Sequence, residues 1–341
     1  MLPSKVDRGD EAAEPVDPGE SVVSPPESHC HHTAHTARSA MIWPQSAVAV
    51  PKASCRSRAR SPIAASFGAV VDALGDAGEW LVDTLEDGVD AILEAVDAIL
   101  DAGPSKRAAA RWMLRQADQV VCCSDSLATR AGDALKLPTE RVITVHNGIN
   151  PEILDQAGHL RYRPQTGTFK DYLINVATFR PGKGQDVLIE AYLQLIREGI
   201  RAALVLVGRT TPHLSRLRSQ VRRHGLHEHV FFLPDLDHAH TLAAIHKAKL
   251  LVQPSHDEPF GLPLLEAMSC GTPVIYGDNS SMPEIVGDAG LAVDSRDTAA
   301  MAGHMKRLVT DDHLAQQLGH QALARSRKFT WDRAARETLE A

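Results

Sequence analysis

From residue 171 to residue 328, short apolar runs alternate with longer segments in which apolar residues recur at helical spacing. The apolar runs predict strands over 171–177, 203–208, 230–233, 249–253, 273–276 and 291–293. The intervening segments predict helices over 185–198, 212–224, 241–247, 297–309 and 311–328, with a further helix beginning after Gly261. Strands that are joined by helical crossovers lie parallel, with helices on both faces of the sheet. The sequence therefore predicts an α/β fold with a doubly wound parallel sheet.

Three polar or glycine positions follow predicted strands of this sheet. Lys183, Gly208 and Glu258 each come shortly after an apolar run. Ligands of doubly wound sheets bind beyond the carboxyl ends of the strands. We therefore expect these positions to converge on one rim, where the Lys183 ammonium and the carboxylates of Glu258 and Glu266 line one cleft.

The stretch from 249 to 273 has the pattern strand, tight turn, helix. Glu258 lies in the turn, and Glu266 lies about a turn and a half inside the helix that follows Gly261. A helix N-terminus offers free N–H groups and a partial positive charge to a phosphate, and Gly261 allows close approach to the backbone. The carboxylate in the helix suits the two hydroxyls of a ribose, and the carboxylate in the turn suits a second sugar. This arrangement predicts a site for a nucleotide sugar.

A second loop has the composition of a phosphate cradle. It runs from Thr178 to Gly184, between a predicted strand and a predicted helix, and it contains Arg180 and Lys183. Lysine acts there as a point charge and arginine as a planar fork. Arg209, which follows the next strand, faces either phosphate or solvent.

The residues Glu258-Pro259-Phe260-Gly261 and the run from Glu266 to Val274 resemble the E-x7-E signature of retaining GT-B glycosyltransferases of the family 4 type. Two further stretches, 116–151 and 279–290, resemble the end of that family's N-terminal domain and its loop near the donor sugar. Lys183 falls on the lysine of the family, whereas Thr178 stands where the family has arginine and Arg180 follows two residues later. The resemblance covers residues 106–340.

This resemblance implies transfer of a hexose from a nucleoside diphosphate sugar to an acceptor hydroxyl, with retention of configuration. It implies catalytic roles for Glu258, Lys183 and Arg180. The implied donor-binding residues are Glu266, Gly261, Phe260, Leu262, Gly208, Arg209 and Thr178. Enzymes of this fold generally need no metal, so we expect neither a metal nor another cofactor. The acceptor would be a glycan, a lipid or a small molecule.

The domain organisation follows from composition and from the resemblance. We expect no regular structure over most of 1–65, a helical region with the remnant of an acceptor-side domain over 66–151, and a linker over 152–168. A Rossmann-like donor domain is expected over 169–329, and a closing helix that crosses back to the N-terminal domain over 330–341. The implied N-terminal domain is shorter than the family's, so a second hypothesis is a non-catalytic or truncated nucleotide-sugar-binding module that needs a partner chain.

Two N-terminal features allow alternative interpretations. The spacing of residues 68–102 predicts an amphipathic acidic helix or a broken pair of helices, without lysine or arginine. Its acidic side is either a solvated face over a core or a surface for a partner protein. The tract His29-Cys30-His31-His32, followed by His35, contains zinc-type ligands. Zinc needs a scaffold that fixes tetrahedral geometry, and the surrounding sequence predicts none, so a compositionally biased tract is the favoured interpretation.

Composition limits the other classes of protein to which this chain could belong. A net charge of −7 over 341 residues does not indicate a nucleic-acid binder. The five cysteines lack the spacing of a metal site or a disulfide framework, which fits a reducing compartment. The N-terminus lacks a signal-peptide pattern, and no apolar run reaches the roughly 20 residues of a membrane span. We expect a cytoplasmic protein, either free or peripheral to the inner face of the membrane.

Overall fold

The computed structural model describes residues 48–50, 119–150, 154–155 and 158–340. All of these residues lie in one compact unit, 43–341. Two features of the sequence lie outside the described residues: the acidic segment 68–102 and the tract of histidines near the N-terminus.

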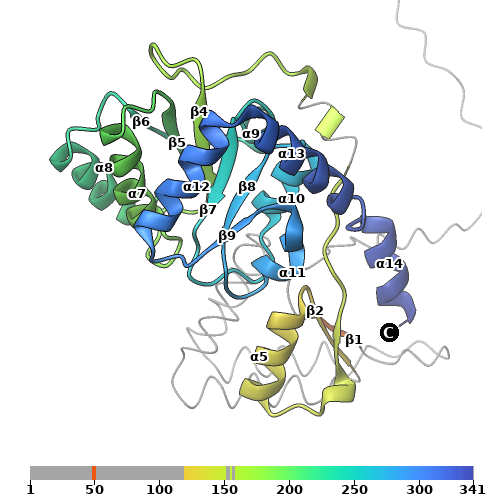
Figure 1. The fold of residues 1–341 in the computed structure, drawn as a ribbon. Coiled ribbons are helices and arrows are strands. Elements are labelled where there is room, and N and C mark those ends of the chain that lie inside the picture. The colour runs from red at the N-terminus through yellow and green to blue at the C-terminus, as the bar shows by residue number, and fades with distance from the viewer. Residues whose placement is uncertain (1–47, 51–118, 151–153, 156–157, 341) are drawn as a thin grey trace, which may run out of the picture. The chain divides into compact units, whose positions relative to one another are not determined.

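A six-stranded parallel sheet forms the centre of the larger domain (Figure 1). Its strands, in spatial order, are β6 (Val230–Pro234), β5 (Ala203–Gly208), β4 (Tyr172–Val176), β7 (Leu250–Gln253), β8 (Val274–Gly277) and β9 (Leu291–Val293). Every pairing in this sheet is parallel. The doubly wound parallel sheet predicted from the alternating pattern is confirmed. The order reverses between β4 and β7, and open α/β sheets bind ligands at such a switch point.

Helices cover both faces of this sheet (Figure 1). Helices on one face are α7 (Gln185–Arg197), α8 (His213–Arg223) and α12 (Thr298–Thr310). Helices on the other face are α9 (His238–His246), α10 (Leu262–Ser269) and α11 (Met282–Val286), which continues into the short 3-10 helix η2 (Gly287–Ala289). Helix α13 (Asp312–Ser326) contributes side chains to both cores.

The sheet has one hydrophobic core on each face, because successive side chains of a strand alternate between the faces. Leu173 packs on the face of α7 and α12, while its neighbour Ile174 packs on the face of α9 and α10, and both are fully buried. Successive side chains of a strand point to opposite faces, so a strand that is covered on both sides is a continuous apolar run. This explains why the strands of the sheet lack polar alternation.

Helix α9 begins at His238, three residues before the predicted start. Asp237 caps the helix, because its side chain accepts a hydrogen bond from the backbone N–H of His240. The first turn is polar, so the apolar spacing from which the helix was predicted does not include it. This earlier start places the His238 side chain beside α10.

A smaller sheet has the order β1 (Val48–Val50), β2 (Gln119–Cys122) and β3 (Val142–Thr144). Strands β2 and β3 are parallel, and β1 adds antiparallel to β2 from a region where no strand was predicted. Between β2 and β3 lie α5 (Asp125–Leu135) and a short 3-10 helix, η1 (Thr139–Arg141). The C-terminal helix α14 (Trp331–Glu340) packs Ala334 against Val121 and Val145.

Among the described residues, no helix is both long enough and apolar enough to cross a bilayer.

Candidate functional site

Two loops meet at the carboxyl ends of β4 and β7. Gly184 caps α7 in the left-handed region with a φ of 69°, and a Cβ placed on it would lie 2.1 Å from the Pro254 carbonyl oxygen. The His256 N–H donates to the Gly182 carbonyl across the same junction, at 2.8 Å. Only glycine permits this close approach without strain. The contact brings the loop from Thr178 to Gly184, which the sequence predicts to bind phosphate, against the loop that carries Glu258.

A buried ion pair lies where these loops touch. Lys183 Nζ donates to Glu258 Oε2 at 2.9 Å, and the two side chains are only 10% and 9% exposed. Gln253 Nε2, at the end of β7, lies 3.4 Å from the same carboxylate oxygen. Two charges at this depth are tolerated only when they are paired, because each alone would lose its hydration without compensation. The sequence predicted these two residues at one rim, and the structure places them in direct contact.

The loop between β8 and α11 holds the Glu258 backbone. The hydroxyls of Ser280 and Ser281 each donate to the Glu258 carbonyl at 2.6 Å, and the Glu258 N–H donates back to Ser280 Oγ at 2.7 Å. Ser280 adopts a φ of 52°, which is uncommon for a residue other than glycine. The loop that resembles the family's donor-sugar loop therefore fixes the position of Glu258.

Helix α10 starts at the glycine that follows this loop. Gly261 has a φ of 93°, and no side chain caps the helix. The first backbone N–H groups of such a helix carry partial positive charge. Because Pro263 lacks an N–H, it fits the first turn without leaving another donor unpaired. An anion at this helix end would meet both the backbone and the dipole.

Glu266 lies on α10 and pairs with a histidine rather than with Lys183. Glu266 Oε1 lies 2.7 Å from His238 Nε2. Glu266, His238 and Leu262 also line a cavity of about 100 Å³. The contacts thus form two pairs, Lys183 with Glu258 and His238 with Glu266. That both pairs line a single cleft remains a prediction.

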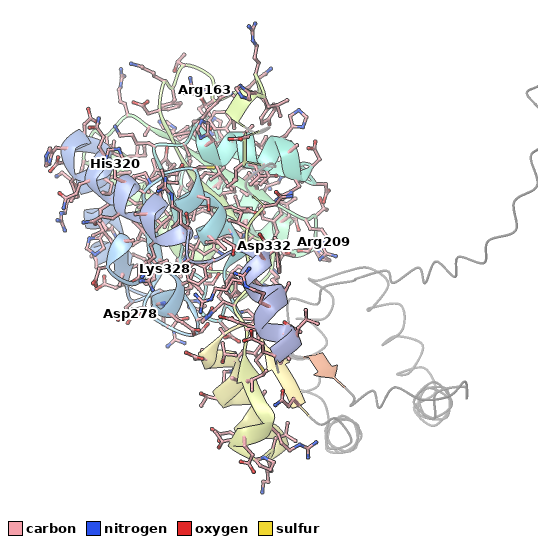
Figure 2. All side chains as sticks on the ribbon, turned by 90° about the vertical axis from the view of Figure 1, so that its right-hand side faces the viewer. Arg163, Arg209, Asp278, His320, Lys328 and Asp332 are labelled. Atoms are coloured by element: carbon pink, nitrogen blue, oxygen red, sulfur yellow. The ribbon has the colours of Figure 1, made fainter. Side chains whose placement is uncertain are left out.

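The other predicted site residues differ in how much of them is accessible. The Phe260 side chain is buried against His146 and Phe329, so it belongs to the core and only its backbone is available to a ligand. Gly208 lies at the end of β5, where a Cβ would come within 1.9 Å of the Ala177 carbonyl oxygen. Arg209 is exposed at the surface just beyond this glycine (Figure 2).

The remaining predicted positions lie in the loop before α7. Arg180 is half-buried, and its backbone N–H donates to the Thr178 carbonyl at 2.8 Å. Gln185 Nε2 lies 3.4 Å from the same carbonyl. The Thr178 backbone therefore shapes the turn that presents Arg180 and Lys183.

Glu284 forms a third polar centre, which the sequence did not indicate as a site. Its carboxylate accepts the backbone N–H groups of Asp125 and Ser126, at 2.9 and 3.4 Å, and it lies 2.5 Å from His146 Nε2. Burial of Glu284 raises the pKa of its carboxyl, but the hydrogen bonds from His146 and Asp125 outweigh this effect, so its pKa lies below the usual value. The residue thus caps α5 from a distant part of the chain. Only the resemblance of the segment 279–290 pointed to this region.

The same centre contains the atoms that a metal ion would use. The side chains of Asp125, His146 and Glu284 each offer one ligand atom, and these atoms lie within 4.8 Å of one another. The Glu284 carboxylate already accepts hydrogen bonds from the α5 backbone, so its structural role as a cap accounts for its position.

The larger domain is a parallel, doubly wound domain with a lysine–glutamate pair at its switch point, and the GT-B fold contains domains of this architecture. Comparisons with known proteins agree with this class. Residues 161–325 match the family model described as glycosyl transferases group 1. The larger domain of this chain is therefore similar to a group 1 glycosyltransferase domain.

The chain is 34% identical to O-antigen chain mannosyltransferase B of Escherichia coli over 177 residues, which are 51% of this chain and 46% of the relative. It is 30% identical to a glycogen synthase of Mycobacterium tuberculosis, over 68% of this chain and 56% of the relative. The chain thus spans about half the length of the curated relatives it matches. Sucrose-phosphate synthase from Thermosynechococcus elongatus has a similar structure, with a TM-score of 0.60 and 26% identity over 70% of this chain and 61% of that one.

Proposed function

We propose that this protein transfers a hexose from a nucleoside diphosphate sugar to an acceptor hydroxyl, with retention of the anomeric configuration. The observation that supports this proposal best is the buried contact between Lys183 and Glu258 at the switch point of the sheet. The relatives named as a mannosyltransferase and a glycogen synthase transfer sugars, and the match includes this domain.

In this proposal the pyrophosphate of the donor binds between the two loops and the start of α10. Departure of the leaving group adds negative charge to the pyrophosphate. Lys183, Arg180 and the N–H groups that follow Gly261 would stabilise this charge where it develops. The ammonium of Lys183 is already fixed by Glu258, so little reorganisation is needed when the donor binds.

The two carboxylates would bind the two sugars of the donor. Glu258 would hold hydroxyls of the transferred hexose. Hydrogen bonds from Ser280 and Ser281 to its backbone carbonyl would keep its position fixed. Glu266 would hold the hydroxyls of the ribose, since it lies further along α10 and lines the cavity beside Leu262. Contacts from the remaining predicted residues, Gly208, Arg209 and Thr178, would surround the phosphates.

No metal takes part in the proposed reaction, because the lysine, the arginine and the helix end supply the positive charge. The acceptor is a glycan, a lipid or a small molecule with a free hydroxyl. The family 4 assignment and the retention of configuration rest on the spacing of Glu258 and Glu266 and on the residues between them.

Transfer and donor hydrolysis by the purified chain test this proposal, with UDP-, GDP- and ADP-linked glucose and mannose as donors. We expect Lys183→Ala to lower kcat by about 100-fold, because stabilisation of the leaving group is lost, and Glu266→Ala to raise the donor KM. Lys306→Ala is the control, because Lys306 pairs with Glu198 at an exposed position of α12.

Wild-type kinetics in both site variants would refute the assignment of these residues. Binding of a nucleotide sugar without turnover would instead support the module hypothesis, in which this chain needs a partner.

A further inference from the structure

The Glu266 carboxylate has one specific partner, which comes from a neighbouring helix. Helices α9 and α10 lie side by side on the same face of the sheet (Figure 1). His238 is the first residue of α9, and its Nε2 lies 2.7 Å from Glu266 Oε1. The histidine side chain is 60% exposed and the glutamate side chain 12%. The ring therefore covers one edge of a largely buried carboxylate and is itself accessible to a ligand.

The second oxygen of this carboxylate is left for another donor. Within the described part of the chain, the contact with His238 is the only hydrogen bond to the Glu266 side chain. The carboxylate borders the cavity of about 100 Å³, whose other walls include Leu242 and Leu262. A water molecule occupies about 30 Å³ in the liquid, so this cavity accepts a group of a few heavy atoms, such as the hydroxyl-bearing edge of a sugar ring.

The pairing has a consequence for binding. A glutamate side chain has three rotatable bonds, and fixing them costs entropy when a ligand binds. A ring N–H that already holds Oε1 fixes the plane of the carboxylate before binding. An ionised carboxylate accepts up to about four hydrogen bonds, so the Glu266 carboxylate can still accept from two adjacent hydroxyls.

The local charges support the same arrangement. The hydrogen bond to Glu266 raises the pKa of His238, partial burial opposes the rise, and the charges of Glu266 and Asp237 add to it. Cys270, which follows α10, has a pKa raised to about 12 by burial and by the charge of Glu266, so it stays a neutral thiol. Glu266 and Asp237 are thus the charged groups that act on the ring.

We propose that His238 is a positioning residue that orients the Glu266 carboxylate for a vicinal diol and thereby makes the site selective for ribose over 2′-deoxyribose in a nucleoside diphosphate. This inference rests on the proposed function, because it assigns the ribose of the donor to Glu266. It adds a residue that the spacing of the two glutamates does not include.

Calorimetric titration with UDP, GDP and ADP, and with their 2′-deoxy forms, tests the inference on the full chain. Wild type is expected to bind at least one ribonucleotide about tenfold more tightly than its deoxy form, the usual effect of one hydrogen bond to a charged group. In His238→Ala this ratio is expected to fall towards one, through weaker binding of the ribonucleotide. His238→Gln should retain most of the ratio, because its amide N–H can still donate to Oε1.

His240→Ala is a matched control from the same helix turn. His240 pairs with Asp237 at 2.6 Å and stacks edge-on against Tyr162, so it resembles His238 in having a carboxylate partner. Its loss should leave the ratio of ribose to deoxyribose binding unchanged.

Three outcomes overturn the inference. An unchanged ratio in His238→Ala refutes the role of His238 and leaves the proposed function intact. No binding of any nucleoside diphosphate by wild type refutes both. The pairing itself is checked without a ligand by NMR titration of the imidazole, where Glu266→Gln should lower the pKa of His238; an unchanged pKa would refute the contact on which the inference depends.

Discussion

At the scale of single residues, Lys183 and Glu258 form the buried charge pair of the proposed site. Both side chains lie below the surface, and each compensates the charge of the other. A ligand that approaches this pair would therefore meet a lysine whose position is set by the fold. The cost of this arrangement is that neither residue can be removed alone without leaving a buried charge.

Lys183→Met is expected to lower the free energy of unfolding by about 3–5 kcal/mol, because it leaves the Glu258 carboxylate buried and unpaired. Urea unfolding measures this change. The double variant Lys183→Met with Glu258→Met should recover much of the loss, because no unpaired charge remains. Lys306→Met removes an exposed pair with Glu198 and should cost less than about 1 kcal/mol. Equal stability of the Lys183 variant and wild type would contradict the burial of the pair.

Two glycines offer opposite expectations for the same substitution. In Gly208→Ala the new methyl group would collide with the Ala177 carbonyl, so a loss of about 1–3 kcal/mol is expected. In Gly303→Ala, in the middle of α12, the methyl group meets nothing within 4 Å, and the gain in helix propensity should stabilise the protein by about 1 kcal/mol. Thermal unfolding of both variants checks the two signs. A stable Gly208 variant would mean that β4 and β5 separate easily at the site.

At the scale of elements, α5 is fixed at its N-terminus by residues from the larger domain. Ser124 caps the helix by accepting the Leu127 N–H, and its hydroxyl also donates to the Pro259 carbonyl at 2.7 Å. Glu284, on α11, accepts two further N–H groups of the first turn of α5. The loop of Glu258 is thus held from two sides, by the loop before α11 and by the end of β2.

Glu284→Gln is expected to lower stability by about 2 kcal/mol at pH 7, because the charged acceptor at the start of α5 is lost. The pKa of Glu284 is lower in the folded protein than in the unfolded chain. Its contribution is therefore fully present above the unfolded pKa of about 4.3 and disappears as the pH falls through the folded value. Urea unfolding of wild type and variant should converge only as the pH falls below the lowered pKa of Glu284 in the folded protein.

The exposed helix pair of Arg333 and Glu337 provides the control for this measurement. Glu337→Gln should change stability by less than about 0.5 kcal/mol at either pH. A constant difference between wild type and Glu284→Gln across the whole pH range would mean that the carboxylate charge of Glu284 does not contribute.

At the scale of the whole molecule, the proposed reaction takes its positive charge from the chain itself, through Lys183, Arg180 and the start of α10. Removal of divalent cations with EDTA is therefore expected to leave the proposed transfer rate unchanged, measured as release of nucleoside diphosphate. A loss of activity that Mn²⁺ or Mg²⁺ restores would contradict this expectation. It would then direct attention to Asp125, His146 and Glu284, whose ligand atoms lie close together.

The sequence by itself determined the architecture of the larger domain. Apolar runs that are buried on both faces predict parallel strands, and periodic segments between them predict crossover helices, because both signals are local. The spacing of Glu258 and Glu266 around Gly261 and the lysine loop after β4 also predicted where a candidate site lies, since short stretches of chain fix these positions relative to a strand end.

The partners of these residues were decided only by the tertiary structure. Nothing local to Glu266 identifies His238, which lies 28 positions earlier and becomes its neighbour only because α9 and α10 pack on the same face. Phe260 belongs to a motif yet is core, since its neighbours His146 and Phe329 come from distant segments. Glu284 likewise caps a helix 158 positions away. Such contacts depend on how the elements pack, and local propensity and spacing do not contain that information.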